Sequence, residues 1–385
     1  MNYELSDAHR GLQSEMGAFC REAIAPSAAC FDEAPPDEAA VRIKANVKKL
    51  ACKGFINLLL GGDLLGTCVA GEELARVCPS TYIAVVSSAI AFGRAVKLFG
   101  TDAQLQRYLP LLAAGEAIGA FASTEAEAGS DLGGMATSAE KRDDRWILNG
   151  EKDLVTNAPL ADLFLVLAWT DRAAGLERGM TLFLVDRFAE GLRIGKPAET
   201  MGLRGAPTAG IRMENCAVTD EAILGGGAGA GWGSVKALLE EMKLALSVLG
   251  VGVGTACMEE STRHAKAKKA FGKPIGLFEG VGAKLAIMFT LNDLGRMMTL
   301  RAAWAMEQRD PEAPVLASCA KLFTSEAAGR IADLAMQVHG GHGYLKGAAV
   351  ERLYRDGRFA QLAWGTSEMQ RAFIAKDSLD RFRAA

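Results

Sequence analysis

The sequence predicts a multidomain protein in which a helical domain is followed by a β domain and then by a second, larger helical domain. Three observations predict this order. Ala, Leu, Glu, Lys and Arg dominate the first part with apolar residues at helical spacing, short apolar runs separated by Gly, Asp, Asn and Pro come next, and helical periodicity returns after a glycine-rich run. We therefore expect domains at residues 1–118, 119–228 and 229–385.

The individual elements follow from the same patterns. Residues 102–112 carry apolar side chains at helical spacing, and the runs at 146–150, 163–167, 180–185 and 210–214 are typical of short strands. The glycine-rich run spans residues 225–233 and is expected to be flexible. Helical periodicity then continues almost to the end, interrupted at Pro274, Pro311 and the glycines of 340–343.

Composition excludes several classes of protein. A net charge of −3 over 385 residues lacks the basic excess of a nucleic-acid binder. The polar start has no signal-peptide pattern, so we expect a cytoplasmic location. The longest apolar stretch identified, residues 244–258, is shorter than the roughly 18–20 residues that span a bilayer and predicts a buried helix.

The cysteines and histidines do not predict a metal site. The eight cysteines form no CxxC pair and no zinc-type spacing with the four histidines, so we interpret them as reduced thiols, mostly in the core. His339 and His342 flank a glycine pair in a predicted turn. The glycine-rich segments 225–233 and 250–254 do not fit GxGxxG after a strand, which excludes a Rossmann dinucleotide site.

Three segments, in order, carry distinctive motifs. They are FASTEAEAGSD at 121–131 with LNGEK at 148–152 and Thr156-Asn157; AFGKPI at 270–275; and QVHGGHGY at 337–344 with Arg355-Asp356 and Gly365-Thr366-Ser367. Together they resemble the signatures of the acyl-CoA dehydrogenase family. The resemblance covers essentially the whole chain. It implies a helical N-terminal domain, a middle β-barrel domain and a C-terminal four-helix bundle.

The resemblance also implies FAD, bound noncovalently. Thr124 and Thr156 would lie against the flavin ring, although Thr is also a common strand residue. Gly340 and Gly341 would let the backbone approach the adenosine-diphosphate part, although a glycine pair also commonly ends a helix. The implied cofactor-binding residues are Phe121, Ser123, Thr124, Leu154, Thr156, Lys268, Phe271, Gln337, Gly340, Gly341 and Thr366.

The family's substrates and partners are implied in the same way. An acyl thioester of CoA or of an acyl carrier protein would contact Ser130, Glu240, Met242 and Gly365. Gln337 would contribute from a neighbouring subunit, which implies a homotetramer or homodimer. An electron-transfer flavoprotein is a possible electron acceptor, and neither nucleic acid, a membrane span nor a metal is expected.

The catalytic base of the family is the main departure. Family members that desaturate thioesters carry a glutamate immediately before the Gly-Thr or Gly-Ser step, where this chain has Trp364, whose indole cannot accept a proton at neutral pH. Some branches place the base on the first long C-terminal helix, where counting back from Phe271 gives Met242. Glu241 is one residue away from that position and is the alternative candidate base.

Other family positions differ too. Leu154 stands where a tryptophan usually lies beside the flavin, Lys268 stands near the usual phosphate-binding arginine, and Glu279 replaces the usual glutamine. Three hypotheses follow: a desaturase of acyl thioesters with another base, a same-fold flavin enzyme with different chemistry such as an oxygenase or ring-forming enzyme, and an inactive homologue that binds an acyl carrier or a partner.

Overall fold

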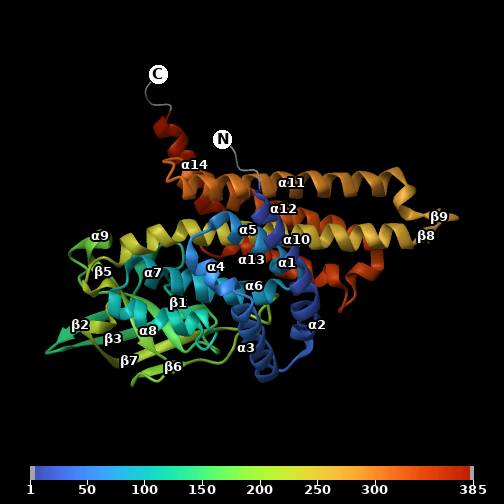
Figure 1. Cartoon of the computed structure of the whole chain (residues 1–385). Helices are drawn as coiled ribbons and strands as arrows, with labels where there is room; N and C mark the ends of the chain where they lie inside the picture. Colours follow the sequence, from blue (N-terminus) through green and yellow to red (C-terminus); the bar gives the residue numbers. More distant parts are fainter. Residues whose placement is uncertain (1–4, 382–385) are drawn as a thin grey trace.

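The computed structural model describes residues 5–381 and places helices on either side of a central β region along the chain (Figure 1). The sheet lies at one end of the molecule, and the short hairpin β8–β9 projects at the opposite end. The long helices α10, α11 and α12 run along the molecule between these two ends. The expected fold class, helical then β then helical, is confirmed.

Short helices make up the N-terminal part. Their bounds are α1 Asp7–Phe19, η1 Cys20–Ile24, α2 Ala25–Glu33, α3 Pro36–Cys52, α4 Phe55–Gly61, α5 Leu64–Val77, α6 Pro79–Val86, η2 Ser87–Arg94, α7 Ala95–Phe99 and α8 Asp102–Ala113. The predicted helix at 102–112 is therefore confirmed as α8. Its first turn is closed by a capping box between Thr101 and Gln104.

Segments α6, η2 and α7 form one apolar helix, Pro79–Phe99, that is long and apolar enough to cross a membrane by length and composition alone. In the structure 83% of the most apolar 18-residue stretch of this helix is buried inside the fold, as in the core helix of a globular protein. The expectation that residues 244–258 form the longest apolar stretch was wrong. The helix Pro79–Phe99 is the longer apolar stretch, and it was missed because Ser87, Ser88 and Gly93 interrupt its apolar pattern.

The β region forms a seven-stranded sheet in the order β1-β4-β2-β3-β7-β6, with β5 paired to β4. The four predicted strands lie within β3, β4, β5 and β7. The other three were not predicted because they are short or polar. The bounds are β1 Gly119–Ala122, β2 Ser138–Arg142, β3 Arg145–Thr156, β4 Leu163–Trp169, β5 Met180–Asp186, β6 Leu192–Ile194 and β7 Thr208–Thr219, with η3 Leu132–Gly134, α9 Gly175–Gly179, η4 Asp220–Ala222 and η5 Leu224–Gly226 between or after them.

The C-terminal part is built from long helices. The first of them begins inside the glycine-rich run that was expected to be flexible, so that run is only partly a linker. The bounds are α10 Gly231–Ala267, β8 Lys269–Ala270, β9 Lys273–Pro274, η6 Ile275–Leu277, α11 Glu279–Glu307, α12 Ala313–His339, η7 Gly340–Tyr344, α13 Ala349–Leu362 and α14 Ser367–Arg381.

The second glycine-rich segment lies in the middle of α10 and serves packing. A Cβ at Gly250 would lie 2.7 Å from the carbonyl oxygen of Thr324, and one at Gly252 would lie 2.6 Å from the Cβ of Ala75. At Gly254 it would lie 2.1 Å from Asn292. These distances are too short for real contacts, so the glycines let α5, α11 and α12 approach α10 closely.

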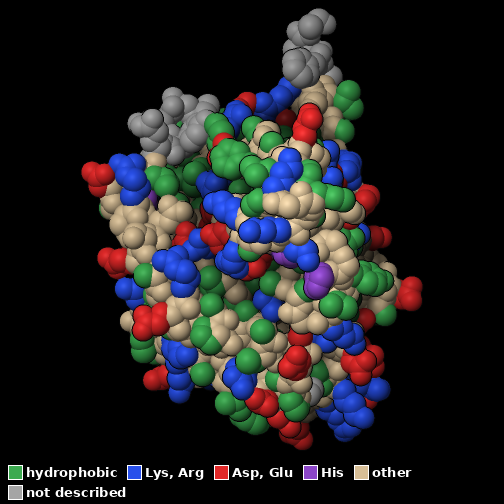
Figure 2. Space-filling model, turned by 90° about the vertical axis from the view of Figure 1, so that its right-hand side faces the viewer, with side chains coloured by type: hydrophobic (Ala, Val, Ile, Leu, Met, Phe, Trp, Pro, Cys, Tyr) green, Lys and Arg blue, Asp and Glu red, His purple; other side chains and the backbone are tan. Residues whose placement is uncertain are grey.

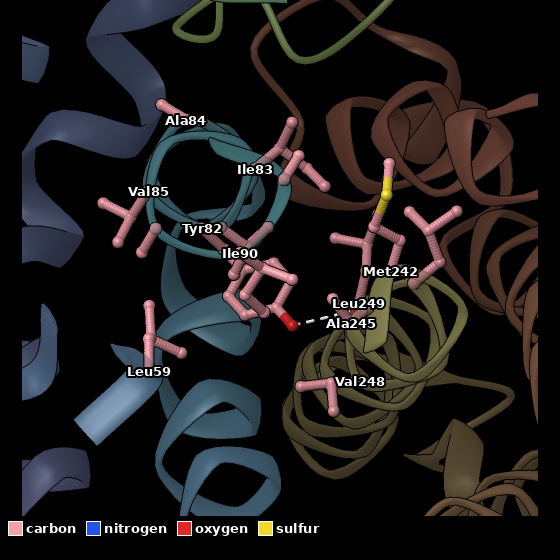
Figure 3. Close-up of a cluster of buried hydrophobic side chains, with 14 of the residues drawn as sticks. Leu59, Tyr82, Ile83, Ala84, Val85, Ile90, Met242, Ala245, Val248 and Leu249 are labelled. Atoms are coloured by element: carbon pink, nitrogen blue, oxygen red, sulfur yellow. Dashed lines mark hydrogen bonds between the residues drawn. The ribbon is translucent and has the colours of Figure 1, made fainter. Parts of the chain in front are cut away.

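A buried apolar cluster joins the N-terminal helices to α10 (Figure 3). Tyr82 of α6 is buried in this cluster, and its hydroxyl donates a hydrogen bond of 2.8 Å to the carbonyl oxygen of Ala245 in α10. The bond satisfies a polar group that would otherwise be costly to bury. The interface therefore fixes how α6 lies against α10.

All eight cysteines are free thiols, and five of them are buried. Burial raises the pKa of the Cys78 thiol to about 11, which keeps it protonated and unreactive at neutral pH. Among the residues that the structure describes, no group of three or more His, Cys, Asp or Glu side chains is arranged to hold a metal ion.

Asp356 of α13 ties the loop before β7 to the helical domain. Its carboxylate is buried and accepts a hydrogen bond of 2.6 Å from the backbone N–H of Leu203. Burial raises the pKa of Asp356 from its ordinary 3.8 to about 6. The neighbouring Arg355 forms ion pairs with Asp32 and Glu351, so one short segment joins α2, the loop and α13.

We expect Asp356 to make stability pH-dependent. Because its pKa is raised in the folded protein, folding is favoured while the carboxyl is protonated, and this contribution is lost as the pH rises from about 4 to about 6. Asp356→Asn retains an acceptor for the Leu203 N–H but cannot ionise. Denaturation across this range should show the wild type losing roughly 1–3 kcal/mol relative to the variant. Glu190→Gln on the surface is the control, and parallel pH profiles for wild type and Asp356→Asn would contradict the expectation.

Candidate active site

The segment that follows β1 is held against β3 by a buried ion pair. The Lys152 ammonium, with its side chain fully buried, donates to Glu125 Oε1 at 2.8 Å and to the carbonyl oxygen of Ser123 at 3.1 Å. The backbone N–H of Asp153 donates to the carbonyl oxygen of Thr124 at 2.9 Å. Ser123 and Thr124, two of the expected flavin-binding residues, therefore occupy fixed positions.

The electrostatics of this pair follow from its burial. Burial lowers the pKa of Lys152 to about 8, and the hydrogen bond that Lys152 donates to the Glu125 carboxylate opposes the shift. For Glu125, burial pushes the pKa upward, but hydrogen bonds from Lys152, Thr137 and Ala136 outweigh it and the net pKa is lowered. The carboxylate is therefore ionised and engaged in holding the loop, which leaves it unsuited to proton transfer.

A bulge in β3 places the next two expected residues. The register with β7 shifts between Lys152 and Val155, and Leu154 inside the bulge has φ 51° and a side chain that is 61% exposed. Bulges commonly redirect a side chain beside a site. Thr156 follows the bulge and pairs with Thr208 of β7.

Thr156 lines a pocket of about 210 Å³ between the β region and the helical domains. The other lining residues come from α6, the loop before β7, the first residue of β7, and α13. They are Ile83, Thr200, Met201, Gly202, Leu203, Ala206, Thr208, Arg355, Arg358, Phe359 and Leu362. The lining combines apolar side chains, threonine hydroxyls and two guanidinium groups, with no carboxylate among these residues.

Trp364 lies in the short connection between α13 and α14, two residues after the pocket-lining Leu362. Its indole is partly buried against the main core, and its backbone has φ 49°, followed by Gly365 with φ 89°. Thr366, the next expected residue, accepts a hydrogen bond of 3.3 Å from the N–H of Met369 at the start of α14.

The alternative base, Glu241 of α10, forms a bidentate ion pair with Arg94. The two guanidinium nitrogens donate at 2.6 and 2.8 Å, and both side chains are about 10% exposed. Arg94 also donates to the carbonyl oxygen of Leu60, so the pair joins α4, η2 and α10. A carboxylate held in this way has both oxygens occupied by a cation.

The residues on either side of Glu241 face different surroundings. Met242 is 1% exposed and lies in the apolar cluster shown in Figure 3. Glu240 pairs with Lys243 at 3.0 Å, and burial raises the pKa of the Glu240 carboxyl. Ser130 lies exposed in the loop after β1, whereas Phe121 is a partly buried residue of β1.

The remaining expected cofactor residues lie at the β8–β9 end of the molecule. Phe271 at the tip of the hairpin is 95% exposed, and a Cβ at either Gly340 or Gly341 would meet open space. Figure 2 faces this end and shows Lys and Arg side chains gathered around histidines. His264 and His339 stack with ring centroids 4.4 Å apart. Burial lowers the pKa of His264, and His339, Lys268 and His342 lower it further.

One chain therefore separates the expected cofactor residues into two groups. Thr124, Leu154 and Thr156 lie on the β region, whereas Lys268, Phe271, Gln337, Gly340 and Gly341 lie near the far ends of α10 and α12 (Figure 1). Helix α10 has 37 residues, which at about 1.5 Å per residue makes it about 55 Å long.

The donor set of the first group fits a flavin. A flavin ring needs donors for its carbonyl oxygens and N5 and an apolar surround, which the Thr156 hydroxyl, the strand-end backbone and the apolar part of the pocket lining would provide. The absence of a carboxylate among the lining residues avoids repulsion of an anionic reduced ring. The fold and this site define a flavin-dependent enzyme built from two helical domains and a β domain.

Comparison with known proteins identifies the family. Sequence profiles described as acyl-CoA dehydrogenase N-terminal, middle and C-terminal domains match residues 6–116, 120–216 and 229–379. The 3-(aryl)acrylate reductase of Clostridium sporogenes is 36% identical over 97% of this chain and 99% of that protein. The caffeyl-CoA reductase-Etf complex subunit CarC of Acetobacterium woodii is 35% identical over 85% of this chain and 87% of that protein.

Solved structures agree. Butyryl-CoA dehydrogenase from Megasphaera elsdenii superposes with a TM-score of 0.91 and 28% identity, covering 98% of this chain and all of that one. The prolyl acyl carrier protein oxidase AnaB superposes with a TM-score of 0.87 and 30% identity over 97% of this chain and all of that one. The chain belongs to the acyl-CoA dehydrogenase family. FAD as cofactor and an oxidoreductase acting on CH–CH groups are confirmed at the level of the family.

Sequence analysis missed three side chains that support the site: Arg94, Lys321 and Gln370. The two cations could have been noticed, because each is an isolated charge in an otherwise uncharged helical stretch, at 79–96 and 313–325. A charge in such a stretch must find a partner when it is buried. Gln370 gave no signal, because a glutamine in a polar helix is ordinary.

The Lys152–Glu125 pair should be essential for stability. Lys152→Met removes the ammonium and leaves a buried carboxylate unpaired, which should cost about 3–5 kcal/mol of unfolding free energy. Denaturation by urea measures this, and absorbance of the purified protein should show loss of flavin. The matched control is Lys236→Met, which breaks the exposed pair with Glu177 and should cost at most about 1 kcal/mol. Equal losses in the two variants would contradict a special role for the buried pair.

Proposed function

We propose that this protein is an FAD-dependent dehydrogenase of acyl thioesters, carried on CoA or on an acyl carrier protein, whose active site lacks the usual glutamate base. The observation that carries the proposal is Trp364, which occupies the connection before α14, two residues after Leu362, a residue that lines the pocket together with Thr156. The named activities of the relatives support thioesters of both carriers as substrates.

The chemistry requires two transfers from the substrate. The bound flavin supplies a hydride acceptor, while a separate group must take the proton from the carbon next to the thioester carbonyl. An indole has only an N–H donor and cannot take that proton. A positioned base is worth about 10²–10⁴ in rate, so simple desaturation should be slow unless another group acts.

Neither alternative position on α10 supplies an evident base. Met242 is a buried thioether, and Glu241 is neutralised by its bidentate pair with Arg94. Transfer of the substrate proton to Glu241 would remove the charge that Arg94 pairs with and leave the guanidinium buried without an anionic partner. We therefore propose a structural role for Glu241 and a space-filling role for Trp364, whose indole would occupy the place of the family's glutamate at the substrate.

The proposed substrate contacts come from the connection before α14, from α10 and from the loop after β1. Gly365 and Met242 would contact the acyl part, and Ser130 on its exposed loop would contact the thioester or pantetheine chain. Glu240 lies two residues before Met242 in α10. Within the described structure its Oε2 atom is buried and has no hydrogen-bond partner. A polar substrate group that donates to this oxygen would satisfy it.

The reverse reaction is the second candidate. The 3-(aryl)acrylate reductase relative is named for reducing a conjugated double bond. Reduction would take a hydride from the reduced cofactor and a proton from a donor at the adjacent carbon. The same side chains surround the reacting bond in either direction, so the same variants test both.

We further propose a homo-oligomer, a tetramer or dimer, in which a second copy completes the cofactor site. The two groups of expected FAD residues are too far apart to meet within one chain. The exposed apolar side chains of α11 and of the segment before it offer a surface for the second copy. They are Leu277, Ile287, Phe289, Leu294 and Met297.

An electron-transfer flavoprotein is the proposed electron acceptor, in the cytoplasm. The support is the named Etf complex of one relative. The direction of electron flow would follow from which of the two candidate reactions the protein performs.

Anaerobic titration of the FAD protein with a series of acyl-CoAs tests the proposed reaction. The wild type should bleach the flavin slowly, and Trp364→Glu should accelerate bleaching by about 10²–10⁴, because it restores a carboxylate at the expected place. Mass spectrometry of the acyl product should show the loss of two hydrogens. The control is Trp364→Gln, which changes size similarly without providing a base.

The outcomes separate the alternatives. Fast bleaching by the wild type, abolished by Glu241→Gln, would overturn the structural role of Glu241 and identify it as the base. No bleaching by the wild type or Trp364→Glu, whether with CoA or carrier-bound thioesters, would overturn the dehydrogenase proposal and favour an oxygen-dependent reaction or an inactive binding protein.

Mixed oligomers test the composite cofactor site. Thr156→Arg should block the flavin end of the site, and Gly340→Glu should place a bulky anion beside the diphosphate end, so each homo-oligomer should retain little FAD. Refolded or co-expressed mixtures should regain FAD, because a mixed pair contains one site made from two unaltered halves. Recovery of no flavin in mixtures with proven heteromeric subunits would contradict the shared site.

A further inference from the structure

The backbone at Trp364 and Gly365 has an uncommon conformation that needs support. Both residues have positive φ, 49° and 89°. For a bulky residue such as Trp this conformation is a genuine outlier and costs on the order of 1–3 kcal/mol. Something in the surrounding structure must therefore favour it over the extended or helical alternatives.

The support comes from side chains of α12 and α14 that contact the connection between α13 and α14. The carbonyl oxygen of Gly365 accepts hydrogen bonds from the Lys321 ammonium of α12 at 2.6 Å and from Gln370 Nε2 of α14 at 3.0 Å. Lys321 is fully buried, and Gln370 is 3% exposed. Gly365 has φ 89°, a conformation that favours glycine, and a Cβ there would lie 2.7 Å from Gln370 Nε2 and displace that amide.

A second buried lysine lies beside the first but bonds elsewhere. Lys243 of α10 pairs with Glu240, donates to Ser318 Oγ at 3.0 Å and lies 4.8 Å above the Phe373 ring. Lys321 has no ion pair of its own in the described structure. Its partner is the one carbonyl that terminates the Trp364–Gly365 turn.

We propose that Lys321, assisted by Gln370, is a positioning residue that holds the Trp364–Gly365 turn and thereby orients the indole of Trp364 toward the proposed substrate site. The inference rests on the proposed function for the meaning of that orientation, but not for the geometry. An ammonium donating to a carbonyl forms a charge-assisted bond, stronger than a neutral one. In a dry site it favours the one backbone conformation that points the Gly365 carbonyl at α12.

The charge state of Lys321 supports the geometry. Burial lowers the pKa of Lys321 to about 8; Glu368 and Glu326 raise it, and Lys243 lowers it. An amine and an ammonium both donate N–H to the carbonyl, so the turn should persist on either side of this pH. The role of Lys321 is therefore a fixed contact and does not require a protonation switch.

Fluorine NMR of the FAD-containing protein labelled with 5-fluorotryptophan tests the proposal without any turnover. The chain has five tryptophans, and Trp364→Phe assigns the resonance of interest. Lys321→Met keeps the length of the side chain but removes the donor. We expect the Trp364 resonance to shift or split by more than its linewidth while the other four stay in place. Gln370→Met should act in the same direction.

Lys243→Met is the matched control, because it removes the neighbouring buried ammonium without touching the Gly365 carbonyl, and it should leave the Trp364 resonance in place. An unchanged Trp364 resonance in both Lys321→Met and Gln370→Met would overturn the proposal. Movement of all five resonances would also overturn it, as a sign of a general structural role. If Lys321→Met does not fold, Gln370→Met decides alone. If the Trp364 resonance moves selectively but no thioester reduces the wild-type flavin, the positioning role holds and the proposed reaction fails.

Discussion

The structure depends on the close packing of α10 against its neighbours. This helix carries three alternating glycines at its centre, and any side chain there would collide with α5, α11 or α12. Close approach of the backbones increases dispersion contacts and excludes water from the middle of the bundle. It also fixes the two ends of α10, one beside the sheet and the other beside the β8–β9 hairpin, and so sets the separation between the two groups of cofactor residues.

Buried charges then fix the loops that the packing leaves free. Lys152 holds the segment after β1, Arg94 joins η2 to α10, and Lys321 holds the connection before α14. A buried charge is costly unless it is bonded well, so such a residue strongly disfavours alternative loop positions that would leave it unpaired. The site gains rigidity in this way, because each cation contacts a backbone carbonyl or a carboxylate beside a proposed flavin or substrate contact.

The sequence predicted the fold class because the change from helical to strand periodicity is strong at 119 and reverses after the glycine-rich run. It did not predict β1, β2 and β6, since four, five and three residues of mixed character carry too little periodicity. The family motifs predicted residues such as Thr156 that line the pocket. They could not predict that Glu241 is paired with Arg94, because the partners are 147 positions apart and only tertiary packing brings them together.

Several of the motif residues serve the fold, which is separate from the chemistry of the site. Arg355, Asp356 and Gly365 all serve the backbone: they pin the loop before β7, anchor α13 and allow the turn before α14. None of these tasks depends on the side chain at position 364. The constraint there is a left-handed backbone whose following carbonyl, that of Gly365, is held by Lys321 and Gln370. These contacts are made by the backbone, so a change of side chain at position 364 can leave them in place.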